Sequence, residues 1–147
     1  MIKIKQENIL NCNENIIVHQ VNAQGIMGGG VARQLANQYL GLEREYSEFC
    51  ELHSNNYNQL KGQVFKIMIQ GKMIMNMFSQ KPNFDTDYEM MEIAFKEIKE
   101  YAKSFNLTIC MPYGIGCGIA NGDWNEVYKI IEEVFSDYDV TLYKLEV

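Results

Sequence analysis

The chain has 147 residues, 47% of them hydrophobic, so it is long enough to bury one core and too short to bury two. Its 13 basic and 19 acidic residues give a net charge of -6, which excludes a general electrostatic attraction to nucleic acid or to an anionic membrane. We see neither a charged-then-apolar leader nor an apolar stretch of membrane-spanning length, and therefore expect one cytoplasmic domain over residues 1–147.

The hydrophobic periodicity switches repeatedly between that of strands and that of helices. It predicts strands at residues 2–5, 16–21, 64–70, 72–78, 107–112 and 140–145. It predicts helices at residues 31–40, 42–53, 85–105 and 123–135. This alternation is typical of an α/β protein, and we expect a three-layer α/β/α sandwich with a mixed sheet of roughly six strands.

Two of these elements carry more detailed predictions. The strands on either side of Gly71 are expected to form a hairpin, with their methionines in the core. Those methionines are Met68, Met73, Met75 and Met77. Asp85 or Thr86 is expected to cap the long amphipathic helix that follows the hairpin.

Two glycine-rich loops, at residues 25–30 and 114–118, each lie between a buried strand and a helix. Loops at the carboxyl ends of strands form the ligand crevice of α/β sheets, so both are expected to converge on one cleft. There, bare backbone could hold a phosphate or a ribose. Neither the G-x-G-x-x-G fingerprint in its usual setting nor a G-K-[ST] ending is present, which disfavours dinucleotide dehydrogenases and P-loop phosphotransferases. Alternatively, the triple glycine only lets a helix pack closely on a strand.

The four cysteines show no spacing typical of a metal site, and only two histidines accompany them. Reduced thiols and no bound metal are therefore expected at Cys12, Cys50, Cys110 and Cys117. Cys117 is the thiol expected to line a site, although a cysteine in such a loop can also be a small apolar filler.

Three segments resemble the macrodomain family in their order and spacing, and the match covers essentially the whole chain. They are HQVNAQGIMGGGVARQLANQY (19–39), MPYGIGCGIANGDWNEVYKIIEEVF (111–135) and TLYKL (141–145). The chain looks most like the stand-alone macrodomains that dephosphorylate ADP-ribose 1″-phosphate. Its second loop is also similar to the branch that removes ADP-ribose from carboxylate side chains, and to bacteriophage-encoded macrodomains.

The resemblance implies which residues bind ADP-ribose or its 1″-phosphate. Asn8 and Ile9 match the adenine end, and Tyr143 matches an aromatic position near the adenine, or else is only a half-buried strand tyrosine. Asn22 matches the asparagine that contacts the distal ribose. The loop around that ribose corresponds to Gly28, Gly29, Gly30 and Val31. The loop whose N–H groups would hold the diphosphate corresponds to Ile115, Gly116, Cys117, Gly118 and Ile119.

Two residues are candidates for catalysis. His19 matches a histidine that resembles the catalytic one of the phosphatase branch, where it could donate or accept a proton; it could also be a satisfied core residue. Asp123 could activate water, cap the following helix, or do both. We expect no cofactor and no metal, and a monomer that meets nucleic acid only as an ADP-ribosylated substrate.

The chain departs from the hydrolase branch at two positions. Gln80 lies nearest to the place of that branch's nucleophilic lysine, with Lys81 one residue away, and Ala120 stands where that branch has an aspartate. These departures favour phosphate-ester cleavage over a lysine adduct. Two alternatives stay open: an ADP-ribosyl hydrolase acting on protein or nucleic acid, and a non-catalytic protein that reads or sequesters ADP-ribose.

Overall fold

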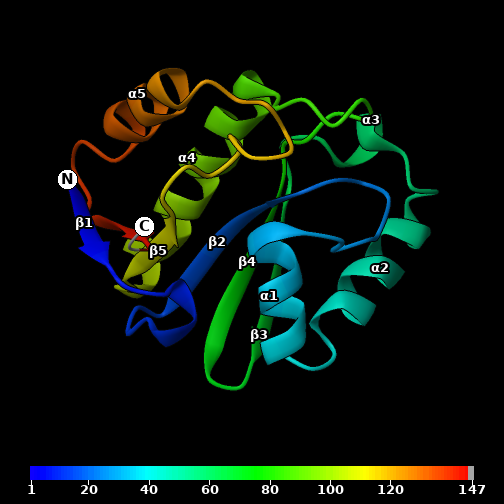
Figure 1. Ribbon diagram of the computed structural model, residues 1–147, viewed down its shortest axis with the longest axis horizontal. Coiled ribbons are helices and arrows are strands. Elements are labelled where there is room, and N and C mark those ends of the chain that lie inside the picture. Colours follow the sequence, from blue (N-terminus) through cyan, green and yellow to red (C-terminus); the bar gives the residue numbers. More distant parts are fainter. Residues whose placement is uncertain (146–147) are drawn as a thin grey trace.

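One mixed sheet of six strands forms the centre of the computed structural model, which describes residues 1–145 (Figure 1). The strands are β1 (Ile2–Gln6), β2 (Ile16–Val21), β3 (Val64–Ile69), β4 (Lys72–Phe78), β5 (Ile109–Pro112) and β6 (Val140–Lys144). Their order across the sheet is β1-β6-β5-β2-β4-β3, and β3 alone pairs antiparallel. The predicted α/β fold with a mixed sheet is therefore confirmed.

Helices cover both faces of the sheet and complete the three layers. They are η1 (Ile9–Asn11), α1 (Gly30–Gln38), α2 (Leu42–Leu52), α3 (Tyr57–Leu60), α4 (Tyr88–Phe105) and α5 (Trp124–Val134). The buried faces of α4 and α5 share one hydrophobic cluster with the sheet, and those of α1, α2 and α3 share the other. Among the helices of residues 1–145, none combines the length and the apolar character that crossing a membrane requires.

The predicted hairpin is formed by β3 and β4, and it turns at Gln70 and Gly71 with positive φ angles of 48° and 80°. Three of its four methionines lie in the core, as predicted. Met68, however, is 64% exposed, so its predicted burial is wrong. Its strand, β3, forms an edge of the sheet, and Met68 is the second-last residue of this strand, close to the hairpin turn.

The cap of α4 also differs from the prediction. Asp87, rather than Asp85 or Thr86, is the N-cap, and its carboxylate accepts a hydrogen bond from the Met90 N–H at 3.4 Å. Thr86 is buried, and its hydroxyl donates to the Gly116 carbonyl at 2.5 Å. The prediction of Asp85 or Thr86 is therefore wrong, and the tertiary contact that engages Thr86 is not visible in the local pattern.

The central strand β2 positions the functional part of the molecule. It pairs in parallel with β4 on one side and with β5 on the other, and Ile16, Ile17 and Val18 are fully buried. Because all three strands run in one direction, the segments that follow them leave from the same edge of the sheet.

We predict that Phe95→Ala lowers the free energy of unfolding by about 3–5 kcal/mol, because the Phe95 ring is fully buried in α4. Its centroid lies 5.7 Å from that of Phe135, in an edge-on arrangement. Phe105→Ala on the same helix is the matched control: this ring is 62% exposed, and we expect a loss below about 1.5 kcal/mol. Urea denaturation measures both, and equal losses would contradict the assignment of the core.

Candidate functional site

A cleft of about 540 Å³ lies at the carboxyl edge of β2, β4 and β5. The first glycine loop, the start of α1 and the second glycine loop form much of its wall. The two loops meet directly, since a Cβ atom on Gly29 would lie 3.2 Å from the Ile119 Cδ1 atom. The predicted convergence of the two loops on one cleft is thus confirmed.

No carboxylate, ammonium or guanidinium side chain lines this cleft in the part of the chain that the structure describes. Its polar side chains are those of His19, Gln20, Asn22, Gln24, Gln80 and Tyr113. A ligand held here would be contacted by neutral donors and acceptors, by apolar side chains and by backbone.

Several backbone N–H groups of the cleft-lining residues have no hydrogen-bond partner in the described segment. Within residues 1–145, the N–H groups of Gly28, Gly29, Gly30, Gly116, Gly118 and Ile119 donate no hydrogen bond. Gly30 begins α1, so the positive end of the helix dipole faces the cleft. Unpaired N–H groups at a helix N-terminus and in glycine loops are suited to bind phosphate or another anion.

Glycine is needed at specific points of these loops. Gly30 and Gly116 have φ angles of 57° and 77°, in the left-handed region that disfavours other residues. A Cβ atom on Gly122 would lie only 2.4 Å from the Gly116 carbonyl oxygen, which accepts the Gly122 N–H at 2.9 Å. Glycine is therefore required at Gly122 because its backbone packs directly against that of Gly116.

A hydrogen-bonded cluster anchors the second loop to the sheet. The Ser79 hydroxyl donates to the Gln20 Oε1 atom at 2.7 Å, and the Gln20 Nε2 group donates to the Thr86 hydroxyl at 3.2 Å. Thr86 in turn donates to the Gly116 carbonyl, and its N–H donates to the Ala120 carbonyl at 3.0 Å. This cluster joins the ends of β2 and β4 to the loop after β5.

The segment between β4 and α4 contributes the side chains of Gln80 and Phe84 to the lining of the cleft; the sequence pointed to Gln80, by its place near the hydrolase branch's lysine, but not to Phe84. Phe84 lies at the rim of the cleft, 45% exposed, with a φ angle of 73° that is uncommon for a bulky residue. The Gln80 Nε2 group donates to the Phe84 carbonyl at 2.9 Å and holds this turn. An aromatic ring on a strained, exposed turn beside a cleft is suited to contact a ligand.

The first loop is held in place from α2. The Glu43 carboxylate accepts the Met27 N–H at 2.8 Å and pairs with the Arg33 guanidinium of α1 at 3.0 Å. The Tyr46 hydroxyl lies 2.5 Å from the Asn22 carbonyl oxygen and 2.9 Å from its Oδ1 atom. Asn22 therefore lines the cleft in a fixed orientation.

His19 lines the cleft but is only 2% exposed. Its Nε2 atom lies 2.7 Å from the Asn76 Oδ1 atom, and the Asn76 Nδ2 group donates to the Phe65 carbonyl. This arrangement makes Nε2–H the donor and leaves Nδ1 as a free acceptor, with no partner among the described residues. Burial lowers the pKa of His19 to about 4, against the opposing effect of the Asn76 hydrogen bond, so the ring is neutral at pH 7.

The structure brings most of the predicted binding residues together at the cleft. Those that line it are Asn22, Gly28, Gly29, Gly30, Val31, Ile115, Gly116, Gly118 and Ile119. Cys117 is not among the residues that line it, although both of its neighbours are. Burial, with a smaller effect of the nearby Asp123 charge, raises the pKa of the Cys117 thiol to about 11, so this thiol is protonated.

The residues predicted for the adenine end lie outside the lining of the cleft. Asn8 instead caps η1 by accepting the Leu10 N–H at 3.0 Å, and Ile9 is buried in the core. Tyr143 is 3% exposed, and its hydroxyl donates to the Glu14 carboxylate at 2.7 Å. Their contact with adenine stays a prediction.

Asp123 and Lys81 also lie outside the lining of the cleft. The Asp123 carboxylate caps α5 by accepting the Asn125 N–H at 2.9 Å, as the alternative for this residue predicted. Its role as a base stays a prediction. Lys81 is exposed, and its N–H donates to the Asp85 carbonyl.

The chain is similar in sequence to enzymes that act on ADP-ribose derivatives, although no protein-family model matches it. An ADP-ribose 1″-phosphate phosphatase of Saccharomyces cerevisiae (strain YJM789) is 26% identical, over 88% of this chain and 89% of its own length. The ADP-ribose glycohydrolase OARD1 of Bos taurus is 25% identical, over 88% of this chain and 81% of its own length.

Solved structures extend the similarity to the fold. The macrodomain of Mycobacterium tuberculosis DarG superposes with a TM-score of 0.83 at 21% identity, covering 97% of each chain. Thermosipho africanus DarTG, solved in complex with ADP-ribose, superposes with a TM-score of 0.81 at 14% identity, over 97% of this chain and 41% of its own. The fold predicted from the sequence resemblance is confirmed.

The neutral, buried His19 predicts a loss of stability in acid. Unfolded chains bind the imidazole proton with the ordinary pKa of 6.5, whereas the folded protein binds it only near pH 4. Protonation therefore favours unfolding as the pH falls from about 6.5 towards 4, and we expect His19 to cost about 2 kcal/mol between pH 7 and pH 5. Urea denaturation at both values measures this. His19→Gln should remove that part of the pH dependence, and an unchanged dependence would contradict the assignment.

Proposed function

We propose that this chain, which has the macrodomain fold, binds ADP-ribose in the cleft between its two glycine loops and hydrolyses ADP-ribose 1″-phosphate to ADP-ribose and phosphate. The observation that carries the proposal is that residues of both loops line one uncharged cleft and that several of their backbone N–H groups have no hydrogen-bond partner in the described chain. A ligand with a diphosphate and a terminal sugar phosphate offers the acceptors that such donors require.

The names of the relatives support this substrate class. One relative, which aligns with this chain over 89% of its own length, is named an ADP-ribose 1″-phosphate phosphatase. Another is named an ADP-ribose glycohydrolase. The two names share ADP-ribose and differ in the bond that is cleaved. The choice between the bonds therefore depends on the groups that line the cleft of this chain.

Phosphate-ester cleavage suits these groups. A water molecule would attack phosphorus, the bond from phosphorus to the 1″ oxygen would break, and the proton of the water would on balance pass to the departing oxygen. Backbone N–H groups would stabilise the charge on the other phosphate oxygens. The Nδ1 atom of His19 is a buried acceptor with no partner among the described residues, so it would orient the water by accepting a hydrogen bond once a shift of the neighbouring loops admits that water.

Of the two roles predicted for His19, proton donor and proton acceptor, its neutral state favours the acceptor. A ring whose pKa is about 4 is not an effective proton donor at pH 7, because it carries no extra proton to release. Its Nε2–H group is also engaged by Asn76. We therefore assign His19 as the acceptor that positions the water.

The uncharged lining also favours one alternative, a protein that binds ADP-ribose without turnover, since no strong acid, base or amine lines the cleft among residues 1–145. A hydrolase that uses a lysine adduct fits less well, because Lys81 is outside the lining. Calorimetry with ADP-ribose, together with phosphate release from the 1″-phosphate, separates these functions. Binding without phosphate release would favour the protein that binds ADP-ribose without turnover. No binding at millimolar ADP-ribose would contradict both that function and the phosphatase.

We predict that His19→Ala lowers phosphate release by about a hundredfold or more, while ADP-ribose still binds. The variant removes the acceptor for the water but leaves the backbone donors of both loops unchanged. Steady-state kinetics measures the rate, and calorimetry shows that the cleft is intact. A decrease below about tenfold would mean that His19 does not position the water.

Asp123→Asn tests the other predicted catalytic residue. Asparagine is an equally good N-cap, so α5 should be preserved while the carboxylate is removed. Because Asp123 does not line the cleft, we expect phosphate release within about threefold of that of the unaltered protein. A hundredfold loss would instead identify Asp123 as the base.

We predict that Gly29→Val weakens ADP-ribose binding by about a hundredfold or more, because its side chain would project into the contact between the loops. The φ angle of Gly29 is -156°, which any residue adopts, so the backbone itself is not strained. Combining Gly29→Val with Ile119→Ala removes the side chain that meets the new Cβ atom. Partial recovery of affinity is expected, and full affinity in Gly29→Val would mean that this glycine only serves packing.

A further inference from the structure

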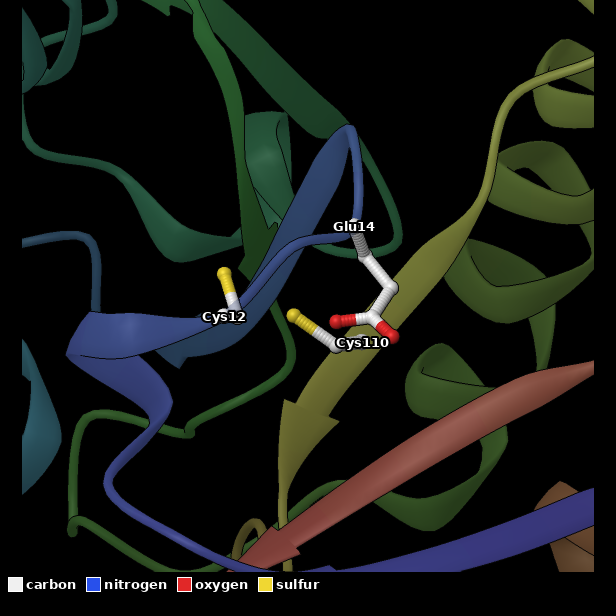
Figure 2. Close-up of side chains that lie close together, drawn as sticks. All are labelled: Cys12, Glu14 and Cys110. Atoms are coloured by element: carbon white, nitrogen blue, oxygen red, sulfur yellow. The ribbon is translucent and has the colours of Figure 1, made fainter.

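A second cluster of reactive side chains lies away from the cleft, around Cys12, Glu14 and Cys110 (Figure 2). The spacing of the cysteines in the sequence predicts no metal site, since Cys12 and Cys110 are 98 positions apart. The fold nevertheless brings their sulfur atoms and a Glu14 carboxylate oxygen within 4.8 Å of one another.

The positions of these three residues in the fold explain why their side chains lie close together. Cys12 directly follows η1, Glu14 lies two residues before β2, and Cys110 is the second residue of β5. The parallel register of β2 and β5 places Ile17 beside Cys110, so the chain that leads into β2 passes next to this thiol. Cys12 and Cys110 are buried, and Glu14 is half-buried.

Neighbouring groups hold two of these ligands in place. The Tyr143 hydroxyl donates to Glu14 Oε1 at 2.7 Å, and Oε2 has no hydrogen-bond partner in the described chain. The Lys72 ammonium donates to the backbone carbonyls of Cys12 and Glu14, at 2.9 and 2.6 Å. The Tyr143 hydrogen bond is of the kind that orients a ligand carboxylate and raises metal affinity, whereas those of Lys72 fix the backbone that carries Cys12 and Glu14.

We propose that Cys12, Glu14 and Cys110 form a zinc-binding site. Thiolate and carboxylate are ligands of Zn²⁺, and three protein ligands leave one tetrahedral position to water. Zn–S bonds of about 2.3 Å require a separation of roughly 3.8 Å between the sulfurs, which small side-chain rotations can reach. Two thiolates, one carboxylate, the Lys72 ammonium and Zn²⁺ sum to zero charge, so a neutral assembly would be buried.

The proposed site is distinct from the cleft. Glu14 precedes β2, whereas Asn22 directly follows it, so the two sites lie towards opposite ends of this strand. The zinc ion would link the segment after η1 to β5 and stabilise the fold without contacting ADP-ribose. The zinc proposal can therefore fail while the proposed function holds, and the reverse is also true.

Titration of the reduced, metal-free protein with Zn²⁺ in a calorimeter tests the site. We expect one ion per chain, and with Co²⁺ as a probe we expect thiolate-to-metal charge-transfer absorption. Cys12→Ala and Cys110→Ala should each weaken Zn²⁺ binding by about a hundredfold or more, and Glu14→Gln by about tenfold or more. Cys50→Ala, which removes a buried thiol outside the cluster, should leave the affinity within about threefold.

A measurement on the unaltered protein keeps the proposal testable if a variant fails to fold. Zn²⁺ should protect Cys12 and Cys110 from alkylation, read by mass spectrometry of the peptides, while the half-buried Cys117 stays as reactive as before. The absence of charge-transfer absorption would overturn the proposal. Equal affinity in Cys12→Ala, or Zn²⁺ protection of Cys117 alone, would overturn it too.

Discussion

The parallel pairing of β2 with both β4 and β5 is the constraint on which the functional architecture depends. It makes three chain segments leave the sheet at one edge, and the cleft is built from these segments. The pairing is stable because β2 lies in the interior of the sheet, with side chains buried on both faces. The same register brings the start of β2 next to β5, where Cys110 meets Cys12 and Glu14. One strand arrangement thus creates both the cleft and the thiol cluster.

The cleft combines rigid walls with neutral chemistry. The contacts of Glu43 and Tyr46 hold the first loop, and the chain of hydrogen bonds from Ser79 through Gln20 and Thr86 to Gly116 holds the second. Backbone donors held in this way need no reorganisation to meet a developing negative charge, which is the basis of electrostatic catalysis. A mechanism here would rely on positioned N–H groups, with the uncharged His19 acting as an acceptor.

The thiol cluster, unlike the cleft, has charged groups around it. The Lys72 ammonium donates to the backbone carbonyls of Cys12 and Glu14, and the Tyr143 hydroxyl orients Glu14. Tyr143 resembles an aromatic residue of an adenine site, and in this chain its hydroxyl donates to the Glu14 carboxylate of the cluster. Contact of its ring with adenine stays a prediction.

The sequence by itself determined the alternation of strands and helices, the hairpin, the cap of α5 and the glycine residues of both loops. These features follow from local periodicity, from capping chemistry and from backbone freedom, all of which are set by neighbours along the chain. Tertiary structure decided the rest. The exposure of Met68 depends on its place at an edge strand, and the cap of α4 depends on the contact that engages Thr86. The low pKa of His19, the position of Phe84 at the cleft and the meeting of Cys12 with Cys110 depend on burial and on strand register. These quantities arise between residues far apart in the chain, so no local pattern contains them.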